Sequence, residues 1–531
     1  MRPSALALSL AVVVAASLGG CATLPPGSTF PKLASAAFAQ PEETRVGRKF
    51  ADAARDHPGH SAFRLITIGA EGFAARMQMI DAAERTLDLQ YFIFRGDTTG
   101  RLLTTALLRA ADRGVRLRVL LDDGETAAGD EQVLALAAHP QVEIRIFNPF
   151  AYRGNSRLVR AVEFVFSVSR LDYRMHNKLF VADNASALVG GRNIGDQYFQ
   201  IDPDEQFADD DVFVVGPAVQ KLSNTFDEFW NDALSIPVAA LQGGKPSEAA
   251  LVKHRALLAE QWQLAQTNKV PHVTLAASGE PWTGMIEGRL PLVWSAAQVV
   301  SDSPAKKDVA GGSRIGRLMY EPIAQAARAA TSELLLITPY FVPTAEEMQL
   351  LTDLRQRNVR VRILTNSLES NNQLAAHSGY MHYRVPLLQA GVEVHEVRAL
   401  LGNTRGSGQT AAISAYGNYG LHAKMFVIDR QKLFIGSMNI DQRSVRLNTE
   451  VGLIIDNAAL AAQTATRFEA MTQPANAYQV LLQAQTTGPP RLLWRTQEAG
   501  KTVEYLQEPA RSEWQRLGLN LLSLLPLDGE L

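Results

Sequence analysis

Apolar residues in this chain gather in short runs of strand length, and helical stretches separate these runs. Residues 87–94 form such a run, residues 100–112 form a helical stretch, and further apolar runs follow at residues 115–121 and 142–144. Strands separated by helices of about a dozen residues are typical of parallel pairing through right-handed crossovers. The pattern therefore predicts an α/β fold with a mixed sheet.

The same pattern occurs a second time, about 246 residues later in the chain. A strand-like run at residues 334–341, a helical stretch at 345–357 and further runs at 359–364 and 392–394 repeat the order of the first half. A length of 531 residues also suits more than one folding unit. We therefore predict two pseudo-twofold-related α/β/α sandwich lobes with mixed sheets.

Composition predicts where these lobes begin and end. We place the first lobe at residues 61–240 and the second at residues 286–531. Between them, residues 241–285 carry Gly, Ser and polar clusters and are predicted to be a connector, and the similar residues 400–412 a mobile loop. Residues 21–60 are rich in Pro, Ala and polar residues, which is typical of a tether.

Residues 1–20 have the composition of a secretory signal peptide. Arg2 is the lone charge before an apolar run at residues 5–18, which is shorter than the ~20 residues of a transmembrane helix. The sequence Leu-Gly-Gly-Cys ends at Cys21 and resembles a bacterial lipobox, so we expect a lipid on Cys21. A plain signal peptide with a cysteine nearby is the alternative. Because Ala22 stands where inner-membrane lipoproteins of enteric bacteria carry Asp, we expect anchoring in the outer membrane, facing the periplasm.

Charge and cysteine content bear on the expected partners and on disulfide formation. The net charge is −2, so no global basic field attracts nucleic acid, and no nucleic-acid partner is expected. Cys21 is the only cysteine, which excludes an internal disulfide. We find neither metal-ligand spacing nor a Gly-rich loop before a helix, and we therefore expect neither a metal nor another cofactor.

The candidate chemistry lies in one motif that occurs twice. Its polar positions in the two copies are His176, Lys178, Asp183 and Asn193, then His422, Lys424, Asp429 and Asn439. In both copies the Lys follows the His by two residues, the Asp by seven and the Asn by seventeen. A His and a Lys two apart on a strand share one face. The Asp of each copy is expected to close a turn and brace backbone.

These residue types suit the chemistry of a phosphodiester. Two ammonium groups and two amides can hold its non-bridging oxygens, and neighbouring glycines allow close approach of backbone. One His can attack phosphorus and form a phosphohistidine, while the other protonates the leaving alcohol and then deprotonates the acceptor. Each half supplies one His, so we predict one active site built from both halves. Ser437 replaces Gly191 and either donates to the phosphate or fits the turn.

The two copies resemble the signature of the phospholipase D superfamily, His-x-Lys-x4-Asp-x6-Gly-Gly/Ser-x-Asn. Residues 146–150, 174–178, 190–196 and 446–450 further resemble bacterial cardiolipin synthases of the C type. That resemblance implies a phospholipase D-like fold without a metal, and transfer of a phosphatidyl group to a second glycerol-bearing lipid at a membrane surface. Phosphatidylglycerol is the expected substrate, with phosphatidylethanolamine as the second candidate. The N-terminus departs from the paired transmembrane helices of other cardiolipin synthases.

The resemblance also implies an acidic residue on the outer nitrogen of each His. Glu450 fits this place in the second half. In the first half we favour Asp209, which lies seven residues before Gly216, over Asp211; a solvated acidic turn is the alternative. By the same resemblance His176 is the expected nucleophile and His422 the acid and base.

Other interpretations remain open at this point. With water as the acceptor the same site would be a phospholipase D, and a secreted endonuclease or an inactive lipid-binding scaffold would use the same fold. The remaining candidates in the second half, His377, His382 and His395, are expected to have surface or packing roles. The apolar residues 517–527 are either a docked core segment or a surface that enters a membrane interface.

Overall fold

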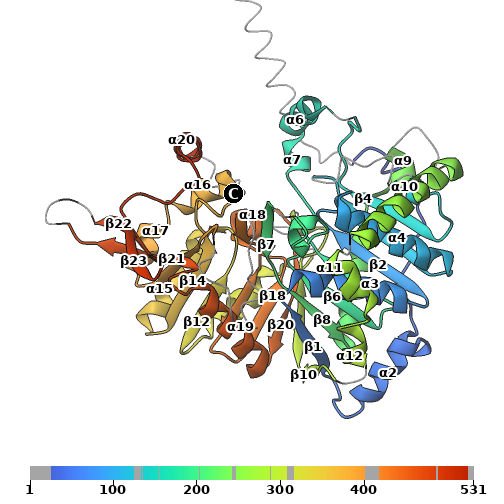
Figure 1. The fold of residues 1–531 in the computed structure, drawn as a ribbon, viewed down its shortest axis with the longest axis horizontal. Coiled ribbons are helices and arrows are strands. Elements are labelled where there is room, and N and C mark those ends of the chain that lie inside the picture. Colours follow the sequence, from blue (N-terminus) through green and yellow to red (C-terminus); the bar gives the residue numbers. More distant parts are fainter. Residues whose placement is uncertain are drawn as a thin grey trace, which may run out of the picture.

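The computed structural model describes residues 25–124, 133, 135–154, 156–202, 204–241, 247–268, 270–286, 289–307, 316–400, 418–485, 488 and 490–523. The predicted signal peptide, Cys21 and all but the first residue of the predicted loop at 400–412 lie outside these ranges. Two large mixed sheets with helices packed on them form the described part, so the predicted α/β class is confirmed (Figure 1).

The first sheet has nine strands in the order β10-β1-β8-β6-β5-β2-β3-β4-β9. They are β1 (Ser61–Ile66), β2 (Thr86–Tyr91), β3 (Arg116–Asp122), β4 (Val142–Phe147), β5 (Leu179–Ala182), β6 (Ser186–Gly190), β8 (Asp211–Val215), β9 (Ser235–Pro237) and β10 (Val293–Ser295). Strands β2, β3 and β4 pair in parallel, as predicted, and β5, β6 and β8 pair antiparallel beside them.

The second sheet has ten strands in the order β11-β20-β18-β17-β12-β14-β15-β21-β22-β23. They are β11 (Ala297–Ser301), β12 (Glu333–Ile337), β14 (Arg360–Asn366), β15 (Glu393–Val397), β17 (Met425–Ile428), β18 (Lys432–Gly436), β20 (Val451–Asp456), β21 (Ala477–Gln483), β22 (Arg491–Glu498) and β23 (Lys501–Tyr505). Strands β12, β14 and β15 are parallel and occupy the same places as β2, β3 and β4 of the first sheet.

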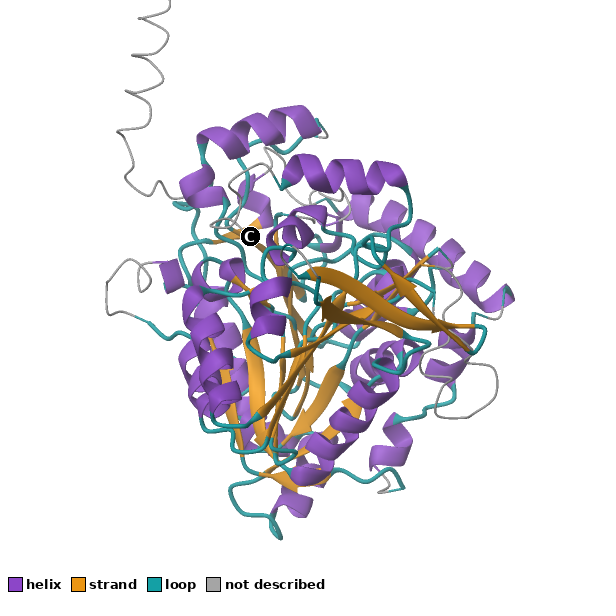
Figure 2. Ribbon diagram, turned by 90° about the vertical axis from the view of Figure 1, so that its left-hand side faces the viewer, coloured by secondary structure: helices purple, strands orange, loops and turns teal. Residues whose placement is uncertain are grey.

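Helices cover both sides of the strands, as the turned view in Figure 2 shows. Those of the first half are α2 (Arg45–Ala54), α3 (Gly69–Ala82), α4 (Thr98–Asp112), α6 (Arg157–Phe166), α7 (Val168–Leu171), α8 (Pro217–Asn231), α10 (Glu248–Thr267), α11 (Pro271–Ala277) and α12 (Trp282–Ile286). Those of the second half are α14 (Tyr320–Arg328), α15 (Ala345–Gln356), α16 (Leu374–Tyr380), α17 (Arg384–Gln389), α18 (Gln442–Arg446), α19 (Ala458–Met471) and α20 (Glu513–Leu522). Short elements are η1 (Pro41–Glu43), η3 (Asp196–Phe199), α9 (Val238–Leu241) and the strands β7 (Glu205–Ala208), β13 (Phe341–Val342), β16 (Asn418–Leu421) and β19 (Ile440–Asp441).

Local sequence sets the starts of the two crossover helices. The side chain of Asp97 accepts from the Gly100 N–H at the start of α4. At the start of α15, Thr344 and Glu347 form a reciprocal capping box. Each cap satisfies N–H groups that a first helical turn leaves without partners. These signals explain why both helices begin close to their predicted positions.

The two lobes share a hydrophobic core. The inner faces of both sheets pack with α8 and α19, and fully buried Trp230, Phe226 and Phe468 lie in this shared cluster. Two extended segments also join the lobes, because β7 pairs in parallel with β16 and Met175 bridges to Thr449. The halves are therefore connected by both apolar packing and backbone pairing, which fixes one motif relative to the other.

The predicted tether at residues 21–60 is partly folded onto the first lobe. Residues Arg45–Ala54 form α2, in which Val46 and Phe50 are buried, and the Phe50 ring lies 6.3 Å from the Phe213 ring. Two apolar residues four apart make one face of a helix. Within a Pro- and Ala-rich segment this short stripe is too small to predict a helix.

The predicted connector at residues 241–285 is also largely helical. Helix α10 packs on α4, and α11 and α12 pack on α3, so these residues extend the first lobe. The chain then passes from one sheet to the other between β10, which pairs with β1, and β11, which pairs with β20. The crossing therefore lies at Ala296, ten residues after the predicted start of the second lobe.

Candidate active site

Both motif histidines line one pocket of ≈ 260 Å³ between the two halves of the chain. Its wall includes residues from both halves, among them Phe92, Arg95, His176, Asn193, Tyr198, Tyr340, His422, Asn439 and Arg443. Burial and the positive charges of both motif lysines lower the pKa of each histidine. The structure thus brings the two predicted motifs into one site.

Each histidine is held by backbone of the opposite lobe. The His176 N–H donates to the Thr449 carbonyl, and the His422 N–H donates to the Ala208 carbonyl. The sequence predicts His and Lys on a strand in each copy. Strands β5 and β17 begin only after the motif lysines, so His and Lys lie in the extended segments that lead into these strands. Pairing across the lobes keeps these segments extended and buried.

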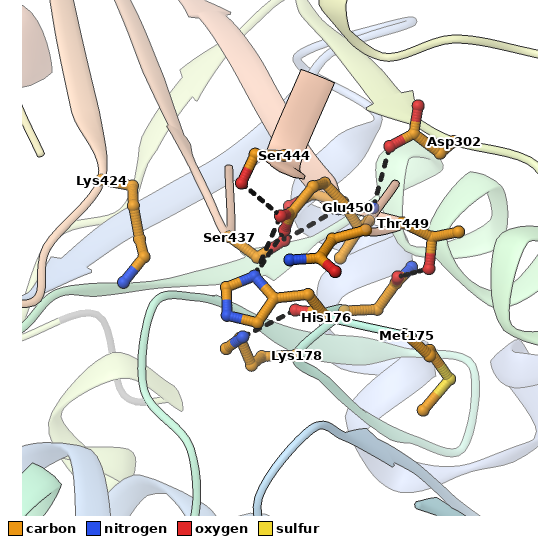
Figure 3. Close-up of polar contacts among 12 residues, drawn as sticks. Met175, His176, Lys178, Asp302, Lys424, Ser437, Ser444, Thr449 and Glu450 are labelled. Carbon is orange, nitrogen blue, oxygen red and sulfur yellow. Dashed lines mark hydrogen bonds and ion pairs between the residues drawn. The ribbon is translucent and has the colours of Figure 1, made fainter. Parts of the chain in front are cut away.

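Glu450, in the second half, contacts the histidine of the first half (Figure 3). Its two carboxylate oxygens each lie 2.9 Å from His176 Nδ1. The hydroxyls of Ser437 and Ser444 donate to the same carboxylate at 2.5 and 2.9 Å. Burial raises the pKa of Glu450 to about 7, although Lys178 and the serines act against that rise. The arrangement fixes the ring of His176 and leaves its Nε2 for the pocket.

Asp209, in the first half, makes the reciprocal contact with the histidine of the second half. Its Oδ2 lies 2.6 Å from His422 Nδ1, and burial raises its pKa to about 7. Asp211 instead forms buried ion pairs with Arg76 and Arg192 at 2.9 and 3.3 Å. The acidic run is buried rather than a solvated turn, and of its members Asp209 contacts a motif ring. Each motif histidine ring therefore contacts an acidic residue of the opposite lobe.

The position occupied by Gly191 and Ser437 differs between the halves for a steric reason. A Cβ on Gly191 would lie 2.1 Å from Asp209 Oδ1, so the shorter acid requires glycine there. In the second half the longer Glu450 leaves room for a hydroxyl, which Ser437 donates to it. Ser437 thus contacts a carboxylate, its expected contact with the phosphate stays a prediction, and Gly191 makes space for a carboxylate.

The motif lysines lie beside the histidines and are fully buried. Lys178 Nζ donates to the His176 carbonyl at 2.7 Å, and Lys424 Nζ donates to the His422 carbonyl at 2.5 Å. Burial lowers the pKa of Lys424 to about 8 and that of Lys178 well below its usual value. Burial and these two cations also lower the pKa of each histidine well below its usual value, so both imidazoles are neutral at pH ~7.

The two motif asparagines line the pocket but are used differently. Asn193 Oδ1 accepts from the Ile93 N–H, and its Nδ2 donates to the Tyr198 hydroxyl at 3.1 Å. Asn439 Oδ1 is buried and has no hydrogen-bond partner among the described residues. A buried amide oxygen without a hydrogen bond is energetically costly. Of the two asparagines, Asn439 is therefore the one whose amide oxygen can still accept a hydrogen bond.

Asp183 and Asp429 bind backbone at the far end of their strands. Asp183 accepts from the N–H groups of residues 84, 85 and 86, and Asp429 accepts from those of residues 331, 332 and 333. Both residues have positive φ angles, 55° and 53°, and neither lines the pocket. This geometry matches the expected turn-bracing role.

We expect Asp183→Ala to lower the free energy of unfolding by about 3 kcal/mol, because three backbone donors lose a buried charged acceptor and Ala disfavours positive φ. Asp183→Asn keeps one acceptor oxygen and tolerates this φ, so its loss should be less than half as large. Urea unfolding followed by circular dichroism measures both. Equal losses for the two variants would contradict the bracing role.

Sequence reasoning did not single out two arginines of the pocket. Arg95 and Arg443 both line it, and Arg443 donates to the Asp172 carboxylate at 2.6 Å. The only available signal was position, since Arg443 follows the second motif asparagine by four residues.

His377 is buried against Glu508 and His395 packs on Phe468, which are packing roles as expected.

Comparison with known proteins finds several that are similar to this chain. A family model described as "Cardiolipin synthase, PLD-like domain" matches residues 77–230 and 323–472. Cardiolipin synthase C of Escherichia coli (strain K12) is 36% identical over 476 residues, which cover 89% of this chain and 96% of that protein. The major cardiolipin synthase of Bacillus subtilis (strain 168) is 25% identical, over 76% of this chain and 67% of that protein. The crystal structure of phosphatidylserine synthase from Haemophilus influenzae shares the fold, with a TM-score of 0.51, 15% identity, and coverage of 81% of this chain and 92% of that one.

Proposed function

The chain belongs to the cardiolipin synthase family of the phospholipase D superfamily, and we propose that it transfers a phosphatidyl group from one phospholipid to the glycerol headgroup of another, producing cardiolipin. One observation carries the proposal: two neutral, buried histidines face the same pocket, and each has a carboxylate on its Nδ1. That pair suits a two-step transfer through a covalent intermediate.

In the first step, His176 Nε2 attacks the phosphorus of phosphatidylglycerol. The N–P bond forms as the P–O bond to the headgroup breaks, and His422 gives a proton to the departing glycerol oxygen. Binding of the anionic phosphodiester raises the pKa of the nearby imidazole, which favours the protonated form of His422 that this step needs. Asp209 stabilises that cation through Nδ1.

In the second step, His422 removes the proton from a headgroup hydroxyl of the second lipid. The freed oxygen attacks phosphorus, the N–P bond breaks, and His176 returns to its neutral form. Lys178, Lys424 and the amide groups stabilise the negative charge on the non-bridging oxygens in both steps. Phosphatidylethanolamine can enter the same scheme as a donor, with ethanolamine as the leaving alcohol.

Membrane attachment of this enzyme is proposed to come from a lipid on Cys21, in the bacterial envelope and facing the periplasm. Membrane association agrees with the family. No helix within the described ranges is both long and apolar enough to span a bilayer. Labelling with a radioactive fatty acid, compared between the natural chain and Cys21→Ala, tests the lipid directly.

Expression in a host that lacks its cardiolipin synthases, followed by mass spectrometry of the lipids, tests the function. We expect cardiolipin to appear, and to disappear with His176→Ala. Phosphatidic acid alone would instead identify a hydrolase. Unchanged lipids together with degradation of plasmid DNA by the purified protein would identify an endonuclease and contradict the proposal.

We expect a bell-shaped dependence of kcat/KM on pH. Burial raises the pKa of Glu450 and Asp209 to about 7, so activity falls as pH drops below that value and the carboxylates become neutral. Burial lowers the pKa of Lys424 to about 8, so activity also falls as pH rises above it and the cation is lost.

Lys424→Arg is the matched variant for this profile, because guanidinium stays charged throughout the range. In this variant the alkaline limb of the profile should shift to higher pH by at least about one pH unit, and the acid limb should stay in place. Rates measured from about pH 5 to about pH 10 give the position of each limb. The comparison does not depend on the absolute activity of the variant. An unchanged alkaline limb would assign it to another group.

A further inference from the structure

Helix α6 has its amphipathic pattern turned outward. Two of its polar residues face the body of the protein, since Glu163 accepts from the N–H groups of residues 151 and 152 and Arg160 donates to the Asp123 carbonyl. Its apolar residues face outward, and Leu158, Val165 and Phe166 are 75%, 69% and 75% exposed. A helix that folded only to fill a core would bury these side chains. None of the α6 residues is buried.

Helix α20 presents a second exposed apolar stripe. Trp514 is 80% exposed, and Leu517 and Leu521, one and two turns further on, are also exposed. The opposite side of the helix is attached to the second lobe, where Leu519 is buried and Gln515 donates to the Leu368 carbonyl at 2.7 Å. Tryptophan is enriched at membrane interfaces, where its ring spans apolar and polar surroundings.

The two helices lie at the same end of the molecule, at the top of Figure 1. Because the view in Figure 2 is turned about the vertical axis, the same end of the molecule is at the top of Figure 2 as well. This end also adjoins the catalytic pocket. Helix α20 packs on α16, whose Ala375 and Ala376 line the pocket. On the other side, α7 follows α6 and leads to Asp172, which pairs with Arg443 of the pocket wall at 2.6 Å.

We propose that α6 and α20 are a membrane-docking surface that rests on the bilayer interface on both sides of the pocket. The proposal rests on the proposed function, because a phospholipid substrate must leave a bilayer to enter this pocket. Two separate apolar stripes that flank one lipid-binding pocket suit a plane of lipid, which contacts both together. Arg157, exposed at the start of α6, adds attraction to anionic lipids.

Vesicle flotation tests the surface with a triple substitution on α6, Leu158→Asp, Val162→Asp and Val165→Asp. The matched control is Val252→Asp, Leu257→Asp and Leu264→Asp on α10, where all three residues are also exposed. All proteins are full chains carrying Cys21→Ser, which removes the predicted lipid. With vesicles of phosphatidylglycerol and phosphatidylethanolamine, the α6 variant should lose at least about tenfold in binding, and the α10 variant less than about twofold.

Activity separates docking from damage to the fold. The α6 variant should lose at least about tenfold in turnover of vesicular phosphatidylglycerol and keep its turnover of monomeric dihexanoyl-phosphatidylglycerol. Vesicle binding equal to the parent chain would overturn the proposal. So would a change from dimer to monomer with vesicle binding intact, which would identify the face as contact between two copies. If the parent binds vesicles but turns over neither substrate, the proposed function fails and the docking surface stands.

A second measurement uses the absence of cysteine in the Cys21→Ser chain. Single cysteines at Val165, Leu521 and Val252 can each carry an environment-sensitive fluorophore. On addition of vesicles we expect blue-shifted, brighter emission from the labels at Val165 and Leu521, and no change from the label at Val252 on α10. A response at Val165 without one at Leu521 would remove α20 from the surface, and no response at either would overturn the whole proposal.

Discussion

His176→Ala is expected to lower kcat/KM by about 10⁴-fold or more, because the substitution removes the atom that forms the bond to phosphorus. The sharpest measurement uses a donor lipid in which p-nitrophenol replaces the headgroup alcohol. This leaving group departs without a proton, so the first step needs only the nucleophile. Rapid mixing should show no burst of p-nitrophenolate from His176→Ala.

His422→Ala is the matched variant in the same experiment. It should release one equivalent of p-nitrophenolate per protein and then stall, because acceptor activation needs the missing base. The stalled protein should carry a phosphorylated peptide that contains His176. With the natural headgroup, its rate should fall by about 10²- to 10⁴-fold. A burst from His176→Ala and none from His422→Ala would exchange the two roles.

Much of the fold follows from local patterns in the sequence. The runs at residues 87–94 and 115–121 become β2 and β3, and the stretch between them becomes α4, because apolar periodicity and helix caps act over a few residues. The same reasoning failed for α2 and α10. Helix α2 packs against β8 and helix α10 against α4, and a local pattern does not contain these contacts.

The sequence could predict the motif residues of the candidate site, but not which acid contacts which histidine ring. The spacing of His, Lys and Asn in two copies indicated which side chains meet. Glu450 and His176, however, lie 274 residues apart, and Asp209 and His422 lie 213 residues apart. Which acid holds which ring depends on how two lobes pack, and two pairings, β7 with β16 and Met175 with Thr449, join the lobes beside these groups. The contact of Ser437 with Glu450 could not be predicted for the same reason, since the fold brings the Glu450 carboxylate close to it.

The second large effect is expected from substituting the two acids, because each acid contacts the histidine of the opposite half. Glu450→Gln should impair the same step as His176→Ala but less completely, with a burst of p-nitrophenolate slowed by about 10²- to 10⁴-fold, because the ring loses the charge that orients it for attack. Asp209→Asn should resemble His422→Ala, with a fast burst and a slow second step. Both amides preserve volume, and thermal unfolding of each variant checks that the fold is intact.

Asp210→Asn is the matched control for these variants. Asp210 is buried next to Asp209 but pairs with Arg467 at 3.3 Å and contacts neither ring. Its burst and steady-state rate should therefore change in equal proportion, if they change at all. If each acid served the histidine of its own half, the pattern would reverse, so that Glu450→Gln kept the burst and Asp209→Asn lost it. The leaving-group dependence thus separates crossed from uncrossed pairing, because each acid affects only the step that its own histidine performs.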